Sequence, residues 1–165
     1  MNTLIDHSPA SAANAMRDEF GMARAILEYS IRENIAGFTL SGLKIPRVIQ
    51  CWGPGTSLPE SADFVLEVAI FQEHLADRIT ALSQNRKLLE EIWRFNEVSR
   101  RFREHELTIP EAASDILDQL ANLVNALFAQ DVDAALAVLQ HCHLRRFDLA
   151  DAIVPRISQR QAEIA

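Results

Sequence analysis

The two strings that most constrain the fold of this chain are SLPE at residues 57–60 and TIPE at residues 108–111. Each joins a hydroxyl residue, an apolar residue, a proline and a glutamate, which is the residue order of a capped helix start. Each also precedes a long stretch in which apolar residues recur at three- and four-residue steps. The strings therefore predict two helix starts and divide the chain into antiparallel helices.

The same periodicity predicts five main helices, over residues 15–36, 58–83, 86–103, 109–129 and 131–154. We expect Asn85 to cap the third helix and Asp131 to cap the fifth, and we expect Pro155 to end or kink the fifth. Strand-like alternation extends no further than residues 47–52. The predicted fold class is all-α, an antiparallel helical bundle of about five main helices.

Two segments fall outside these helices. Residues 1–14 are rich in serine, alanine and asparagine and are predicted to be a flexible leader, so residues 15–165 form the single bundle domain. Residues 39–57 form an irregular connection with a turn at 51–55. This connection is either a lid or, as is more common, a plain crossover between helices.

Composition excludes several classes of protein. With 48% apolar residues and few glycines and prolines among 165 residues, the chain is globular rather than disordered. Its net charge of −7 repels phosphate, so nucleic acid is not an expected partner of this chain. No apolar run spans a bilayer and the N-terminus does not resemble a secretory signal. Cys51 and Cys142 lie far apart in the sequence, which suits two reduced thiols. Because thiols stay reduced in the cytosol, we expect a cytoplasmic protein.

The pair His141 and His143 resembles a metal motif, but helical geometry argues against it. Positions two apart point about 200° apart around a helix, so both rings cannot reach one ion. Projection of the fifth helix places His143 near the centre of the apolar face with Arg146 beside it, and His141 on the opposite, solvated side. His143 is either a hydrogen-bonded core residue or a ligand-facing group, with Arg146 supplying charge for an anion.

Polar residues on two other helices extend the candidate site. On the second helix they follow the edge of the apolar stripe: Glu67, His74 and Arg78. On the third helix they occupy inward or boundary positions: Asn96, Ser99 and Arg103. Each set is either the solvated boundary of a helix or one wall of a pocket. The basic run at 100–103 is interleaved with glutamates, including Glu106, and is predicted to be a solvated helix face.

Motifs with a specific chemistry are absent. The sequence contains no glycine-rich phosphate loop, no HExxH, no GxSxG and no paired ExxH for a carboxylate-bridged metal centre. The residues themselves therefore do not predict a reaction.

From residue 72 onward the chain resembles the helical effector domain of GntR-superfamily transcription regulators, the class that includes the fatty-acid regulator FadR. In that family D-x-x-F-H-x-x-L leads to s-g-N and a leucine-rich helix, then to E-H-x-x-I-x-x-A-L, a G-D cap and D-x-x-x-A-x-x-x-M-x-x-H. The matching stretches here are QEHLADRI at 72–79, SQN at 83–85, LL at 88–89, QL at 119–120, AL at 126–127, QD at 130–131, and then Ala135, Leu139 and Cys142. The resemblance covers about half of the chain, and the family's N-terminal winged helix-turn-helix is missing.

The resemblance implies a small-molecule-binding bundle, and its departures concern metal. Many family members bind a divalent metal through one aspartate and three histidines, and the matching positions here are Gln72, Ala76, Leu120 and Cys142. Glutamine, alanine and leucine do not form a zinc or nickel site. We therefore expect no metal and no other cofactor.

The function that we predict is metal-free binding of a small organic acid or related metabolite by a cytoplasmic bundle, which we expect to be a homodimer. One alternative is a small all-α enzyme in which His143 or His74 is the general base and an arginine anchors an anionic substrate. Another is a bundle that binds a protein partner. An enclosed cavity between the second, third and fifth helices favours the first two, and a solid core with an exposed apolar face favours the third.

Overall fold

The computed structural model describes residues 9–164, and the only regular elements in that range are helices. They are α1 (Pro9–Asn34), the 3-10 turn η1 (Ile35–Gly37), α2 (Arg47–Gln50), α3 (Asp63–Ala81), α4 (Arg86–Glu106), α5 (Pro110–Phe128) and α6 (Val132–Ile164). The prediction of an all-α bundle is confirmed, with five long helices and the single turn α2. Helix α1 begins at Pro9 rather than at residue 15, and the remainder of the predicted leader, residues 1–8, lies outside the described residues.

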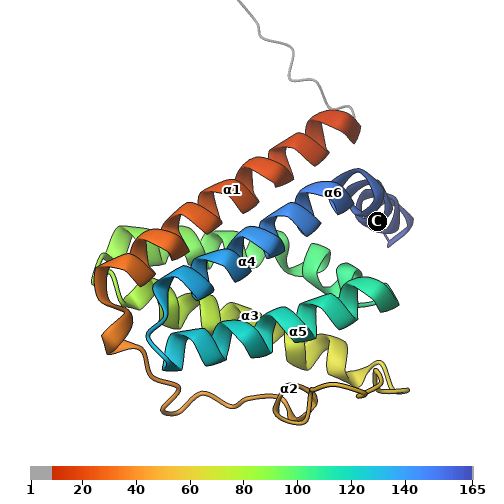
Figure 1. The fold of residues 1–165 in the computed structure, drawn as a ribbon. Coiled ribbons are helices and arrows are strands. Elements are labelled where there is room, and N and C mark those ends of the chain that lie inside the picture. Colours follow the sequence, from red (N-terminus) through yellow and green to blue (C-terminus); the bar gives the residue numbers. More distant parts are fainter. Residues whose placement is uncertain (1–8, 165) are drawn as a thin grey trace, which may run out of the picture.

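Helices α1 and α6 form an antiparallel pair along one side of the bundle (Figure 1). Their direction is marked by two side-chain hydrogen bonds, from Arg17 to Asp151 at 2.7 Å and from Arg24 to Gln140 at 2.6 Å. Helix α6 also contacts α4 and α5, and α3 pairs with α4. Because α6 contacts three other long helices, its side chains reach most of the bundle interior.

The helix starts differ from the prediction in detail. Helix α3 begins at Asp63, after the SLPE string, and α5 begins at Pro110 with the extended Ile109 as its N-cap. A hydroxyl residue two positions before a proline cannot be the N-cap without forcing the intervening residue into helical geometry, which the proline ring disfavours. The predicted caps Asn85 and Asp131 are confirmed, since their side chains accept hydrogen bonds from backbone amides of the following turn.

The segment between α1 and α3 packs against the bundle, as a crossover does. It runs along the lower edge of the view in Figure 1, beneath α3 and α5. Ile49 of α2 is buried, and the Trp52 indole donates a 2.7 Å hydrogen bond to Asp118 on α5. These contacts fix the segment against the middle of α5.

The apolar core consists of two clusters. One is built mainly from α3 and α5, with Phe71, Ile116 and Leu127 among its most buried members. The other is built mainly from α1, α4 and α6, and its centre is an edge-to-face contact between Phe20 and Phe102. Helices α1, α3 and α6 contribute to both clusters. The buried polar residues described next are on α3, α4 and α6.

Pro155 does not end the last helix. Helix α6 continues through it to Ile164, and Figure 1 shows the final turns set at an angle to the rest of the helix. A proline inside a helix removes one backbone hydrogen bond and introduces a kink of this kind.

Candidate functional site

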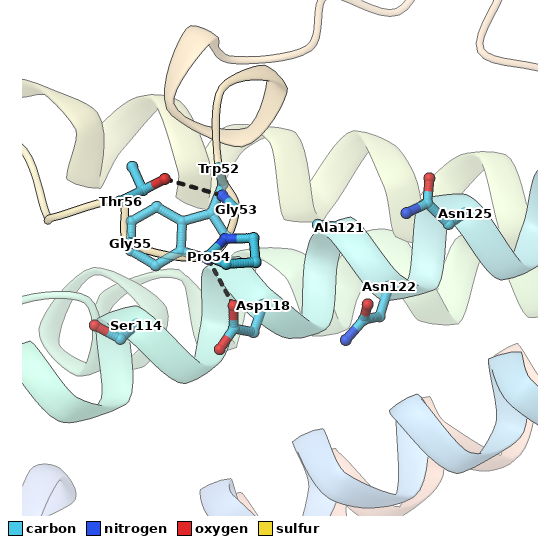
Figure 2. Close-up of a pocket in the computed structure, with 10 residues that line it drawn as sticks. All are labelled: Trp52, Gly53, Pro54, Gly55, Thr56, Ser114, Asp118, Ala121, Asn122 and Asn125. Carbon is cyan, nitrogen blue, oxygen red and sulfur yellow. Dashed lines mark hydrogen bonds between the residues drawn. The ribbon is translucent and has the colours of Figure 1, made fainter.

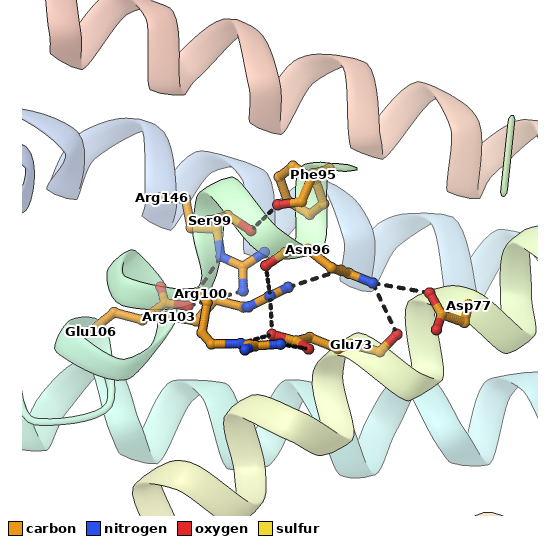
Figure 3. A network of polar contacts seen from close by, with 9 residues as sticks. All are labelled: Glu73, Asp77, Phe95, Asn96, Ser99, Arg100, Arg103, Glu106 and Arg146. Atoms are coloured by element: carbon orange, nitrogen blue, oxygen red, sulfur yellow. Dashed lines mark hydrogen bonds and ion pairs between the residues drawn. The ribbon is translucent and has the colours of Figure 1, made fainter. Parts of the chain in front are cut away.

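A network of buried polar side chains connects α3, α4 and α6 (Figure 3). In its first half, Glu73 of α3 accepts hydrogen bonds from both Arg100 and Arg103 of α4, each with N–O distances down to 2.7 Å. Arg103 also donates to the side chain and the backbone carbonyl of Asn96, which in turn donates to Asp77 at 2.9 Å. This half reaches solvent, because the Arg100 side chain is 52% exposed.

The second half is centred on Glu106, whose side chain is completely buried. Arg146 of α6 donates to one of its oxygens through Nε at 3.0 Å and Nη2 at 2.9 Å. Arg145 Nε lies 3.6 Å from the other oxygen, which has no hydrogen-bond partner among the described residues. Arg145 also donates a hydrogen bond to the Gln119 side chain. Gln119 also accepts from the Cys142 thiol at 3.0 Å. The half is therefore enclosed by α4, α5 and α6.

The network carries more positive than negative charge. Three arginine side chains are at most 15% exposed, Arg103, Arg145 and Arg146, whereas two glutamates are similarly buried, Glu73 and Glu106. One positive charge is therefore in excess, and including the more accessible ends of the network, Arg100 and Asp77, leaves this excess unchanged. An uncompensated buried charge is costly, so such an arrangement favours the uptake of an anion.

The pKa values in the network follow from burial and from these neighbouring charges. Burial and the nearby charge of Arg146 lower the pKa of Arg103 to about 10. Burial alone would raise the pKa of Glu73, but the hydrogen bond from Arg100 and the charges of Arg103 and Arg100 more than offset this and lower it. Burial raises the pKa of Asp77 and that of the Cys142 thiol. The cysteine is thus a packed thiol rather than a reactive thiolate.

A small pocket of about 40 Å³ lies beside the network, between α1, α4 and α6. The predicted pair His143 and Arg146 lines it together with Cys142, Arg24 and apolar residues that include Phe20 and Phe95. The Nδ1 atom of His143 is buried and lacks a hydrogen-bond partner among the described residues. Burial and the charge of Arg24 lower the pKa of His143, whereas Glu28 raises it. As predicted, His141 is exposed.

The ridge predicted on the second helix lines a different pocket. Glu67 and His74 border a groove of about 230 Å³ together with Lys44 from the crossover, over a floor that includes Phe71. Arg78 is not among its lining residues and donates instead to the carbonyl of Ser41 at 2.8 Å. The groove is therefore an outer feature of α3, separate from the buried network.

A wider groove, of about 640 Å³, involves none of the predicted site residues (Figure 2). It lies between the turn that follows Trp52 and a polar stripe on α5 that includes Ser114, Asp118, Asn122 and Asn125. Among its lining residues there is no basic side chain. An organic acid would find no cation here, which distinguishes this groove from the pocket at Arg146.

The seven predicted site residues thus occupy three places. His143 and Arg146 share the small pocket, Asn96 and Arg103 belong to the first half of the network, and Glu67, His74 and Arg78 lie along the outer side of α3. Of the pockets at these places, only the one between α1, α4 and α6 is lined by both a histidine and an arginine, as the enzyme alternative requires.

One prediction about this region is wrong. The basic run of α4 is not wholly a solvated face, because Arg103 is 1% exposed and Glu106 is fully buried, although Arg100 and Arg101 are exposed. Pairing with buried partners explains the difference, since a charged residue can enter a core only when it is compensated. Sequence reasoning also missed Glu73 and Arg145 as members of the network.

Metal chemistry gains no support from the side chains. Within residues 9–164 no group of three or more histidine, cysteine, aspartate or glutamate residues is arranged to hold an ion. In the same range no helix combines the length and the apolar character needed to cross a membrane.

Comparisons of the chain with protein-family models, with curated proteins and with solved structures find no match. The functional interpretation therefore depends on the geometry of the site.

Proposed function

We propose that the bundle binds the carboxylate of a small organic acid, without a metal, in the pocket lined by His143 and Arg146. The observation that carries this proposal is the single excess positive charge of the network beside that pocket. A monoanionic carboxylate neutralises one charge, and arginine binds it with directed hydrogen bonds.

The dimensions of the pocket support a carboxylate rather than a whole metabolite. A water molecule takes up about 30 Å³ of liquid volume, so a space of about 40 Å³ admits a group of two or three atoms. Arg24 also lines the pocket and pairs with Glu28 at 3.3 Å on the partly exposed side of α1. The body of the acid would lie toward this side.

Titration calorimetry with acetate, succinate and benzoate tests the proposal, at constant ionic strength and with chloride as the reference anion. We expect saturable binding of at least one acid to the wild-type protein, and a loss of roughly tenfold or more in His143→Ala and in Arg24→Gln. His141→Ala is the matched control, because this histidine lies on the same helix and is exposed. Binding that is equal in all variants, or no binding of any acid, would contradict the proposal.

Proton linkage gives an independent readout. The pKa of His143 is lowered in the free protein, and a bound carboxylate would raise it, so binding should take up a proton. Affinity should then increase as the pH falls from 8 to about 6, and His143→Ala should remove this dependence.

Elemental analysis that found about one zinc or nickel per chain would exclude the metal-free form of the proposal.

The proposal includes a homodimer, as we expect of a bundle that resembles the GntR effector domain, and a cytoplasmic location, which the two separated cysteines favour. Large exposed apolar side chains are available for an interface, but they are distributed over five helices: Tyr29, Leu66, Ile70, Trp93, Val98, Phe128, Leu144 and Phe147. Light scattering coupled to gel filtration tests the dimer. A mass of one chain across the micromolar range would contradict it.

A further inference from the structure

The groove between residues 53–56 and α5 differs from the carboxylate pocket in size and in charge. Its volume of about 640 Å³ falls within the range of about 300–1,000 Å³ that is usual for small-molecule sites. The groove and the pocket share no lining residue. What binds in the groove is therefore independent of the carboxylate pocket.

The wall of the groove on α5 consists of polar side chains along one face of the helix. They follow one another at steps of four, four and three residues and extend over about 16 Å: Ser114, Asp118, Asn122 and Asn125. The serine and the two asparagine side chains form no hydrogen bond with another described residue. Because each asparagine presents both a donor and an acceptor, this wall offers a ligand hydrogen bonds of both kinds.

The opposite wall holds an aromatic ring in a fixed position. Figure 2 shows Trp52 beside the turn, hydrogen-bonded to Asp118. This 2.7 Å bond orients the indole, and contact with the core cluster of α3 and α5 leaves Trp52 half-buried. The face of an aromatic ring carries partial negative charge and attracts polarised C–H groups. The part of the ring that lines the groove is therefore a platform on which a ligand can stack.

The charges and the apolar area of the groove exclude several classes of ligand. Asp118 is the one charged side chain among the lining residues, so an anion would be repelled. A cation would gain little from this exposed carboxylate, which already accepts a hydrogen bond from Trp52. The apolar lining is limited to Trp52, Pro54 and Ala121, which is too little for a wholly apolar ligand. A neutral molecule with many hydroxyl groups and an apolar face fits all of these conditions.

We infer that this groove binds a neutral sugar, with one sugar ring stacked on Trp52 and hydroxyl groups hydrogen-bonded to Asn122 and Asn125. A pyranose ring has C–H groups on its faces and hydroxyl groups around its edge, which matches an aromatic platform on one wall and amides on the other. Asp118 can accept from a further hydroxyl through the oxygen that Trp52 leaves free. Because the polar stripe is longer than one pyranose ring, a short oligosaccharide should bind more tightly than a monosaccharide.

Calorimetry and two-dimensional NMR with maltotriose and cellotriose test this inference, and glucuronate is the anionic reference. We expect saturable binding of at least one trisaccharide. The chain has two tryptophans, and that sugar should shift the indole N–H signal of Trp52 without shifting that of Trp93, which lies on α4 outside the groove. Glucuronate should leave the Trp52 signal in place.

Variants of both walls locate the binding. Asn122→Ala and Asn125→Ala should each weaken the sugar by about three- to tenfold, because each removes a hydrogen bond. Asp115→Ala is the matched control, since Asp115 is an exposed residue of the same helix that does not line the groove. Trp52→Leu keeps an apolar side chain against the core but removes the ring, and should weaken binding by tenfold or more. If this variant does not fold, the two asparagine variants still decide the question.

Three results would overturn the inference. They are the absence of saturable binding of both trisaccharides, a loss of affinity in Asp115→Ala equal to that in the asparagine variants, and a shift of the Trp52 signal by glucuronate as large as that by the sugars. None of them bears on the carboxylate pocket, whose own test uses His143→Ala and Arg24→Gln.

Discussion

The two halves of the buried network have the same central arrangement but different surroundings. Each consists of a glutamate held by two arginines, Glu73 by Arg100 and Arg103, and Glu106 by Arg145 and Arg146. The first half reaches solvent through Arg100, whereas both arginines of the second are at most 15% exposed.

On the basis of this difference we interpret the first half as structural and propose the binding role for the second. In the first half the exposed guanidinium of Arg100 can be hydrated by solvent when it is not paired with Glu73. Asn96 accepts a hydrogen bond from Arg103 and donates one to Asp77. In the second half the charges are almost closed off from solvent, and Arg146 lines the small pocket that it shares with His143. The same residue types therefore form a structural ion-pair cluster in the first half and a candidate anion site in the second.

From this difference between the halves, we expect the largest loss of stability in Glu106→Gln. Removing this carboxylate charge leaves Arg145 and Arg146 buried without a counter-ion, and breaking a buried pair in this way costs about 3–5 kcal/mol. We expect the free energy of unfolding, measured by urea denaturation, to fall by that amount. A loss below about 1 kcal/mol would mean that water compensates the arginines, and that the second half is as accessible as the first.

Glu73→Gln should have a smaller effect, about 1–3 kcal/mol at neutral pH. When the carboxylate loses its charge, Arg100 can be hydrated and the buried Arg103 keeps its hydrogen bonds to Asn96. The effect should also depend on pH. The pKa of Glu73 is below its ordinary value of 4.5 in the folded protein, so its stabilising contribution is complete above pH 4.5 and is lost as the pH falls through the folded pKa. The difference in stability between wild type and variant should therefore narrow in acid.

Thermal melts of both proteins between pH 3 and pH 7 measure this narrowing. If the two melting curves kept a constant separation over that range, the contribution of Glu73 would come from shape and hydrogen bonding rather than from its charge.

The sequence was sufficient to predict the helices because their determinants are local. Asn85 and Asp131 cap the helices that follow them, and apolar periodicity locates all five long helices, although α1 begins at Pro9 rather than at residue 15 and α6 ends at Ile164 rather than at residue 154. The two proline-containing strings misplace the helix starts. A proline restricts the backbone of the residue before it, and the capping pattern alone does not include this restriction.

The buried network was harder to predict because its partners lie far apart in the sequence. Arg103 and Glu73 are separated by 30 residues, and Arg146 and Glu106 by 40. A signal was present on α4, where Asn96, Ser99, Arg103 and Glu106 continue the buried stripe of that helix. The charge of Arg103 and Glu106 argued for a solvated face, and only tertiary pairing makes their burial possible.

The smallest predicted effects concern the two histidines of α6, and they test whether the second half serves binding. His141→Ala should change stability by no more than about 0.5 kcal/mol, as exposed substitutions usually do. His143→Ala should cost about 1–3 kcal/mol if the ring is a hydrogen-bonded core group. If the ring instead serves the pocket, folding should be nearly unchanged and acid binding should be lost.

Thermal melts with and without acetate, succinate and benzoate distinguish these cases, because a ligand of the folded state raises the midpoint as its concentration exceeds its dissociation constant. We expect the acid that binds the wild-type protein to raise the midpoint of His141→Ala as well, and to leave that of His143→Ala unchanged. If both variants were alike in stability and in ligand response, His143 would have no role in the pocket. The excess charge beside Arg146 would then be a feature of the core, and both halves of the network would have a structural role.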